Sequence, residues 1–207
     1  MKTEKPGGKA EMKRIRILCV ADYHRRKDLA DNVEKLAAKQ KVDVIINAGD
    51  FLSQEFASKV LEATKFRTFV VRGNWDSELK VRNRKVTVLV NGVAEYMGYY
   101  FLGADHRHYD AIERLAKGKD AKKIILLTHD PPYEILDISF FGSNAGSPEL
   151  RLAVEKIQPA LHVFGHIHES AGIMKYERTI FINASLPEFR KAAIIELPGQ
   201  KVRIFDV

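Results

Sequence analysis

Residues 14 to 24 read RIRILCVADYH, and this stretch sets the fold class of the chain. Its apolar run from Arg14 to Ala21 ends abruptly at Asp22, as expected for a buried strand that feeds a functional loop. The next segment, Asp28 to Lys39, has apolar residues at the spacing of one helix face. Val42 to Ala48 is a second strand-like run. The sequence therefore predicts a βαβ unit with parallel strands and a right-handed crossover.

Three further apolar runs follow the same plan, from Phe66 to Val71, Lys123 to Leu127 and Ala160 to Phe164. Each predicted strand ends in a polar motif, and the motifs are Asp22-Tyr23-His24, Gly49-Asp50, Gly73-Asn74-Trp75-Asp76, Thr128-His129 and Gly165-His166-Ile167-His168. Functional sites of open α/β sheets form at the carboxyl ends of strands. The motifs supply two Asp, one Asn and four His, which are ligands for a pair of divalent cations that share a carboxylate. We therefore expect a metal-dependent hydrolase.

Local geometry supports convergence of these ligands. In an extended segment, Asp22 and His24 point to the same side, because side chains alternate along a strand. A glycine directly precedes Asp50, Asn74 and His166, where the missing Cβ lets the backbone turn sharply.

The remaining segments predict short strands and helices. Val86 to Val90 and Val93 to Met97 are strand-like, and Asn91-Gly92 between them is a strong hairpin signal. Helices are expected after Ser53 and from Ser147 to Ile157. Four C-terminal segments are expected to form an antiparallel sheet: Gly172 to Lys175, Thr179 to Asn183, Ala192 to Leu197 and Lys201 to Phe205.

Length and composition favour one domain over residues 14 to 207, preceded by a disordered tail over residues 1 to 13. The tail lacks the apolar stretch of a secretory signal, and no apolar run approaches the roughly 20 residues needed to span a bilayer. Cys19 is the only cysteine, so no intramolecular disulfide can form. We expect a cytoplasmic protein that does not insert into membranes.

The formal net charge of +7 has two interpretations. Basic residues bind nucleic acid by displacing counterions, but here they are spread among acidic residues. The densest cluster, Arg82, Arg84 and Lys85, is short and has no aromatic RNA-binding signature nearby. Attraction of a small anionic phosphate substrate is therefore favoured over a dedicated nucleic-acid surface.

The five motifs, in this order, resemble those of the calcineurin-like metallophosphoesterases, whose pattern spans residues 22 to 168 here. Two flanking segments, Thr128 to Tyr133 and Gly165 to Ser170, look like the branch of small stand-alone phosphodiesterases. The resemblance implies a four-layer αββα sandwich, in which helices flank two mixed β-sheets and the site lies at the C-terminal ends of the strands.

The resemblance also implies roles for seven side chains. One cation would be held by Asp22, His24 and His168, the other by Asn74, His129 and His166, and Asp50 would bridge the two. A hydroxide shared by the cations would then attack phosphorus in line. The ligand types admit manganese, iron, nickel, zinc or cobalt. The implied enzyme is a phosphoesterase that prefers diesters to monoesters and acts on a small phosphorylated substrate, with nucleotides among the candidates.

Trp75 departs from the family pattern. Many members have a histidine at this position, which is taken to protonate the leaving oxygen. Here leaving-group assistance is either weaker or supplied by His106 or His108 as a general acid. The Trp75 ring has two possible roles. It is a structural residue that packs on the core or lines the rim of the pocket, or it stacks on a nucleobase of the substrate.

Two other residues have alternative roles. His162 is either a buried structural histidine or a support for the ligands. Asp76 either orients a ligand or caps a helix that begins near Ser77.

Two other functions are weighed against the enzyme. The same fold serves as a non-catalytic metal-binding scaffold in the retromer complex, but all seven ligand types are present here. A metal-dependent nuclease is chemically close and ranks lower, because the chain carries no dedicated nucleic-acid motif. Oligomer formation stays open.

Overall fold

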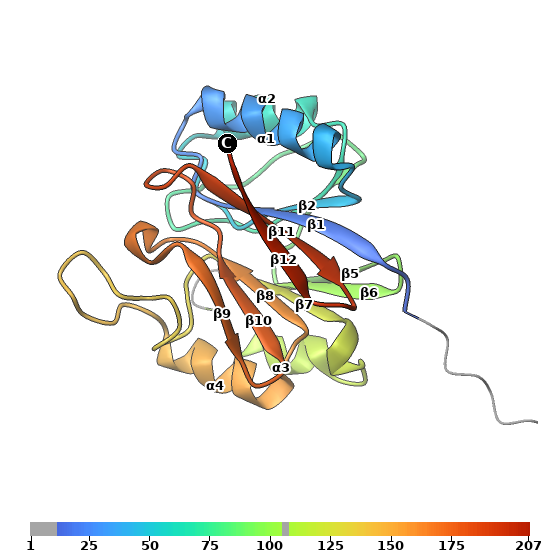
Figure 1. Ribbon diagram of the computed structural model, residues 1–207, viewed down its shortest axis with the longest axis vertical. Coiled ribbons are helices and arrows are strands. Elements are labelled where there is room, and N and C mark those ends of the chain that lie inside the picture. Colours follow the sequence, from blue (N-terminus) through green and yellow to red (C-terminus); the bar gives the residue numbers. More distant parts are fainter. Residues whose placement is uncertain (1–11, 105–107) are drawn as a thin grey trace, which may run out of the picture.

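The computed structural model describes residues 12–104 and 108–207, and Figure 1 shows its arrangement. Most of the predicted tail and the acid candidate His106 lie outside the described residues. No helix in these ranges is long and apolar enough to cross a membrane.

The first sheet has six strands in the order β12-β11-β1-β2-β3-β4. Strands β1 to β4 run parallel, whereas β11 pairs antiparallel with both β1 and β12. The strands are β1 (Ile15–Val20), β2 (Val44–Asn47), β3 (Arg67–Val70), β4 (Val86–Val88), β11 (Lys191–Leu197) and β12 (Lys201–Asp206). The parallel pairing of the first three strands confirms the predicted βαβ organisation.

The second sheet also has six strands, in the order β5-β6-β7-β8-β10-β9. Strands β6, β7, β8 and β10 are parallel, and the two edge strands β5 and β9 are antiparallel to their neighbours. The strands are β5 (Gly92–Tyr96), β6 (Tyr99–Gly103), β7 (Ile124–Leu127), β8 (Leu161–Phe164), β9 (Gly172–Tyr176) and β10 (Thr179–Asn183).

Helices cover the outer face of each sheet (Figure 1). The helices α1 (Lys27–Gln40) and α2 (Gln54–Ala63) pack on the first sheet. The helices α3 (Ala111–Ala116) and α4 (Pro148–Ile157) pack on the second. Short 3₁₀ turns, η1 (Ala121–Lys123) and η2 (His168–Ser170), complete the structure. Ser53 and Ser147 accept hydrogen bonds from the first turns of α2 and α4, so both predicted helix starts are confirmed.

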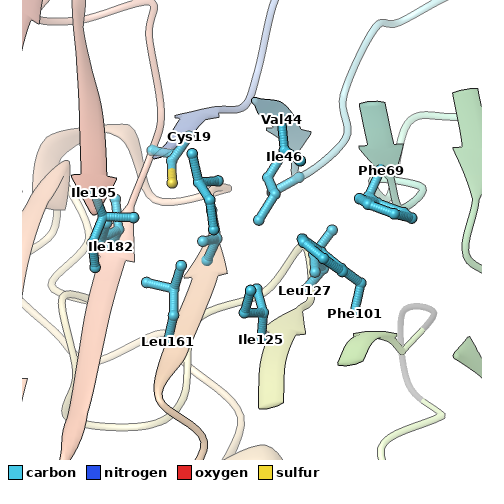
Figure 2. Close-up of a cluster of buried hydrophobic side chains, with 14 of the residues drawn as sticks. Cys19, Val44, Ile46, Phe69, Phe101, Ile125, Leu127, Leu161, Ile182 and Ile195 are labelled. Carbon is cyan, nitrogen blue, oxygen red and sulfur yellow. The ribbon is translucent and has the colours of Figure 1, made fainter. Parts of the chain in front are cut away.

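The central core lies between the two sheets (Figure 2). Phe69 of the first sheet stacks on Phe101 of the second, with ring centroids 4.0 Å apart. Aliphatic side chains of both sheets, among them Ile46 and Ile125, extend this core away from the aromatic pair (Figure 2). The fold is therefore the expected four-layer αββα sandwich.

Two predictions about strand pairing are wrong. Asn91-Gly92 does not join a hairpin, because β4 pairs with β3 in the first sheet while β5 pairs with β6 in the second. The chain crosses between the sheets there, and the actual hairpin turn is at Met97-Gly98, where both residues have positive φ. The four C-terminal strands also do not form one antiparallel sheet. β9 and β10 join the second sheet, where β10 runs parallel to β8, and β11 and β12 join the first.

Candidate metal centre

The polar motifs follow the C-terminal ends of β1, β2, β3, β7 and β8 and meet at one edge of the sandwich. Asp22, His24 and His168 form a first group, with ligand atoms all within 4.8 Å of one another. Asp22 is fully buried, and its Oδ2 accepts hydrogen bonds from the His166 backbone N–H and the Ser185 hydroxyl. The carboxylate is thus fixed on one side by two donors.

A second group forms around His129, which is fully buried. Its Nδ1 lies 2.8 Å from the Ala48 carbonyl oxygen, and its Nε2 lies 2.9 Å from Asn74 Oδ1. The His166 ring lies beside it, with centroids 5.0 Å apart. Because the carbonyl oxygen can only accept, Nδ1 carries a proton and Nε2 is the atom aimed at the centre.

Asp50 lies between the two groups. Its Oδ2 is 3.7 Å from His24 Nε2 and 3.5 Å from His129 Nε2, so one carboxylate oxygen faces both. Its Oδ1 accepts a hydrogen bond from the Trp75 backbone N–H at 3.1 Å. The seven side chains named from the sequence therefore converge in two groups joined by Asp50.

Left-handed backbone, not an extended segment, produces this convergence. Asp22, His24, Asp50 and His166 have φ values of 59°, 46°, 59° and 72°. Such conformations are unfavourable for residues with a side chain and persist where the surrounding structure holds them. The prediction that Asp22 and His24 converge is correct, but the reasoning from alternation along a strand is not.

Glycine is required at two of the turns because the backbone touches a carboxylate. A Cβ on Gly73 would lie 1.9 Å from Asp50 Oδ1, and a Cβ on Gly165 would lie 2.5 Å from Asp22 Oδ2. Any side chain at either position would displace a carboxylate from the centre. These glycines therefore have two roles: they let the chain turn sharply, as predicted, and they leave room for the carboxylates of Asp50 and Asp22.

The order and spacing of the motifs match a known family of proteins. A family model for calcineurin-like phosphoesterases matches residues 15–170, a range that contains all five motifs. The chain belongs to the calcineurin-like phosphoesterase family.

This phosphoesterase has relatives in sequence and in fold. It is 28% identical over 209 residues to a UPF0046 protein of Caenorhabditis elegans, a match that covers 83% of this chain and 69% of the worm protein. The structure superposes on the protein TT1561 of Thermus thermophilus with a TM-score of 0.71 and 16% identity, covering 94% of this chain and 99% of that one. A novel archaeal phosphodiesterase gives a TM-score of 0.63 and 15% identity, covering 93% and 100%. The two structural matches show the shared fold.

Electrostatics at the centre of the phosphoesterase couple His129 to the carboxylates. Burial opposes protonation of His129, but the nearby carboxylates of Asp50 and Asp22 outweigh it and raise the pKa to about 9. Burial likewise opposes ionisation of Asp50, yet His129 and His24 hold the pKa of this carboxyl well below its usual range. Burial and the neighbouring His129 charge lower the pKa of His166. The concentrated negative charge favours a cation at this position.

Asp76 supports the ligand loops and caps no helix. Its carboxylate accepts hydrogen bonds from the backbone N–H groups of Asp50, Phe51, Leu52 and Gly73, at 2.8 to 3.2 Å. Residues 77–83 contain no helix. Of the two roles inferred from the sequence, orientation of a ligand is therefore correct.

His162 combines the two roles proposed for it. It is fully buried, and its Nε2 lies 2.8 Å from the Thr128 hydroxyl, which donates its own proton to the Asp130 carbonyl oxygen. His162 must therefore donate from Nε2. It holds the turn that carries His129, so it is both structural and supportive.

The sequence analysis missed two residues at the centre. Ser185 follows β10 and contacts Asp22, but a lone serine after a strand is not a recognisable signal. Asp130 lies directly after His129, and a carboxylate oxygen lies within 4.8 Å of ligand atoms of His129 and His166. Its position next to a motif histidine could have identified it.

Two remaining candidates lie at the rim or outside the groups. The Trp75 side chain is 70% exposed, so it does not pack on the core. His108 is exposed and belongs to none of the three clusters of potential ligands found among the described residues. His106, the other acid candidate, lies outside those residues.

Proposed function

We propose that this calcineurin-like phosphoesterase is a two-metal phosphodiesterase. The observation that carries the proposal is the position of Asp50 Oδ2, between His24 Nε2 at 3.7 Å and His129 Nε2 at 3.5 Å. These separations exceed hydrogen-bond length and suit a carboxylate that contacts a cation on each side.

The residues present fit two divalent cations. Asp22 Oδ1 and His24 Nε2 are buried and have no hydrogen-bond partner within residues 12–104 and 108–207. Buried polar atoms left in this way are costly unless an ion satisfies them. Asp22, His24 and His168 would hold one cation, and Asn74, His129 and His166 the other. Oxygen and nitrogen donors suit manganese, iron, nickel, zinc or cobalt.

Bound cations would supply Lewis-acid stabilisation of the phosphoryl oxygens and would activate a water molecule at neutral pH. The protein orients the ligands for this task. Ser185 and the His166 N–H fix Asp22, and the Ala48 carbonyl oxygen fixes the tautomer of His129. Asp76 holds the loop that carries Asp50.

Residue 75 supports the preference for diesters. Indole cannot protonate a leaving oxygen, so no acid acts from this position, and esters with good leaving groups should react fastest. A diester carries one negative charge and two substituents, and the exposed Trp75 ring offers an apolar face to one of them. A nucleotide substrate is consistent with this face.

The proposal is tested with bis(p-nitrophenyl) phosphate and p-nitrophenyl phosphate, assayed with Mn²⁺, Ni²⁺, Mg²⁺ or chelator. We expect Mn²⁺-dependent turnover that is faster for the diester. Asp50→Asn should lower kcat by at least about a hundredfold, because it removes the shared negative charge. Asp31→Asn on the exposed face of α1 is the matched control. Absence of turnover with every metal would refute the enzyme, and faster turnover of the monoester would reverse the substrate preference.

A further inference from the structure

Asp130 is a buried carboxylate beside the second ligand group, the one formed by Asn74, His129 and His166. The residue is 8% exposed, and a carboxylate oxygen lies within 4.8 Å of ligand atoms of His129 and His166. Adjacent residues in a strand point to opposite faces, so the convergence of His129 and Asp130 requires a turn that holds both. Asp130 thus lies where a ligand of the second cation would lie.

Contacts around the turn after β7 fix the backbone of Asp130. The Thr128 hydroxyl donates to the Asp130 carbonyl oxygen at 2.7 Å. The Gly165 N–H donates to the His129 carbonyl oxygen at 3.0 Å, which joins this turn to the loop after β8. Pro131 follows, and a proline restricts the residue before it to extended backbone. The backbone of Asp130 is therefore held in place by contacts within the protein.

Tyr109 fixes the side chain of Asp130. The tyrosine is 3% exposed and lies just before α3, where its carbonyl oxygen accepts from the Ile112 N–H at 3.0 Å. Its hydroxyl donates to Asp130 Oδ2. The two oxygens of a carboxylate carry about four acceptor sites, so this hydrogen bond leaves lone pairs for a cation. Donors behind a metal ligand commonly fix its orientation in this way.

Charge distinguishes the two ligand groups. The first contains Asp22 in addition to the shared Asp50, whereas the second contains an amide and two imidazoles, which are neutral when they bind a metal. Each added carboxylate attracts a divalent cation, most strongly where water is excluded. Asp130 would give the second group a carboxylate of its own.

We propose that Asp130 is a further ligand of the cation held by Asn74, His129 and His166, and that Tyr109 orients it. The inference rests on the proposed two-metal function and specifies how the second site is built. Both residues should determine the affinity of that site, and Tyr109 should act only through Asp130.

Isothermal titration calorimetry of the metal-stripped protein with Mn²⁺ tests this assignment. Asp130→Asn removes the charge and keeps the shape, so one of the two Mn²⁺ sites should weaken at least about tenfold while the other changes less than about threefold. Tyr109→Phe should weaken the same site about tenfold. The double variant should match Asp130→Asn, because Tyr109 acts through that carboxylate.

Tyr99→Phe is the matched control for Tyr109→Phe. Tyr99 is buried, and its hydroxyl donates to the Lys13 carbonyl oxygen at 3.0 Å. It is the first residue of β6, which runs parallel to β7, so it lies at the opposite end from the ligands. Both Mn²⁺ affinities should stay unchanged in this variant.

A direct bond from residue 130 to the cation has a spectroscopic signature. Asp130→Cys loaded with stoichiometric Co²⁺ should show a thiolate-to-cobalt charge-transfer band, since thiolates are metal ligands. The wild type, with its buried Cys19, and Asp31→Cys on α1 should lack this band. Tyr109→Phe should shift the d–d bands of bound Co²⁺, whereas Tyr99→Phe should not. A residue that only supports the histidines would give no charge-transfer band.

The ion count separates this inference from the proposed function. If the wild type binds two Mn²⁺ ions and Asp130→Asn binds both with unchanged affinity, or if Asp130→Cys gives no band, Asp130 is not a ligand. Fewer than two ions in the wild type would refute the two-metal function and the inference with it. Two ions in the wild type and one weakened site in Asp130→Asn, without turnover of any ester, would support the ligand and refute the enzyme.

Discussion

Asp22 is a buried carboxylate whose two oxygens have different surroundings. Oδ2 accepts from the Ser185 hydroxyl and from the His166 N–H, while Oδ1 is buried and has no hydrogen-bond partner among the described residues. Donors behind a ligand fix its orientation, and their loss commonly weakens metal binding. Ser185 thus acts through Asp22 and not on the substrate.

Ser185→Ala should weaken Mn²⁺ binding by about tenfold, because Asp22 loses one of its two orienting donors. Isothermal titration calorimetry on the metal-stripped protein measures this change. Excess Mn²⁺ should restore most of kcat, which a merely misfolded variant would not allow. Ser143→Ala, in the exposed loop before α4, serves as the control. Equal Mn²⁺ affinities for Ser185→Ala and the wild type would contradict the assigned role.

At the level of elements, Asp76 ties the loop after β2 to the loop after β3. Four backbone N–H groups point at its carboxylate. Asp76→Asn would place an amide NH₂ against some of these donors, so we expect a loss of about 2 kcal/mol in the free energy of unfolding. Urea denaturation in chelator measures it.

Asp110→Asn is the matched control, since Asp110 precedes α3 and makes no capping hydrogen bond through its side chain. The control should change the free energy of unfolding by less than about 0.5 kcal/mol. If Asp76→Asn also changes the free energy of unfolding by less than about 0.5 kcal/mol, the four N–H groups do not depend on the Asp76 carboxylate for stability.

Local sequence patterns predicted the elements well but not every pairing. The apolar run before Asp22 and the Ser147-Pro148 helix start are local signals, and both were correct. The pairing of β10 with β8 depends on the packing of the whole sheet, which no local pattern contains. For the same reason Asn91-Gly92 indicated a hairpin where the chain instead crosses between sheets.

The candidate site was predictable to a similar extent. Ligand types and their positions after strands were visible in the sequence, because chemistry requires those residues there. The contacts that support the ligands were not visible in the sequence. Ser185 contacts Asp22, for example, although the two residues are 163 positions apart in the chain. The left-handed backbone at His24 was equally hidden, since non-glycine residues rarely adopt it.

At the scale of the whole molecule, His162 makes stability depend on pH. Burial lowers its pKa from the ordinary 6.5 to about 3. As pH falls below 6.5, the unfolded chain takes up a proton that the folded chain refuses, so stability decreases. This contribution is fully present above pH 6.5 and is lost progressively toward pH 3.

Between pH 7 and pH 5, His162 should therefore reduce the free energy of unfolding by about 2 kcal/mol. Glutamine cannot ionise. From pH 7 to pH 5, the free energy of unfolding of His162→Gln should therefore decrease by about 2 kcal/mol less than that of the wild type. Urea denaturation of both proteins in chelator at the two pH values gives the difference. Parallel pH profiles would show that His162 ionises in the folded protein.

The two six-stranded sheets bring together ligands from residues 22 to 168 because five parallel strands end at one edge. Two cations held around Asp50 are the central proposal, and their number can be counted. Equilibrium dialysis against Mn²⁺, followed by elemental analysis, should find two ions per chain in the wild type and at most one in Asp50→Asn. Binding of a single ion or none by the wild type would contradict the two-metal site.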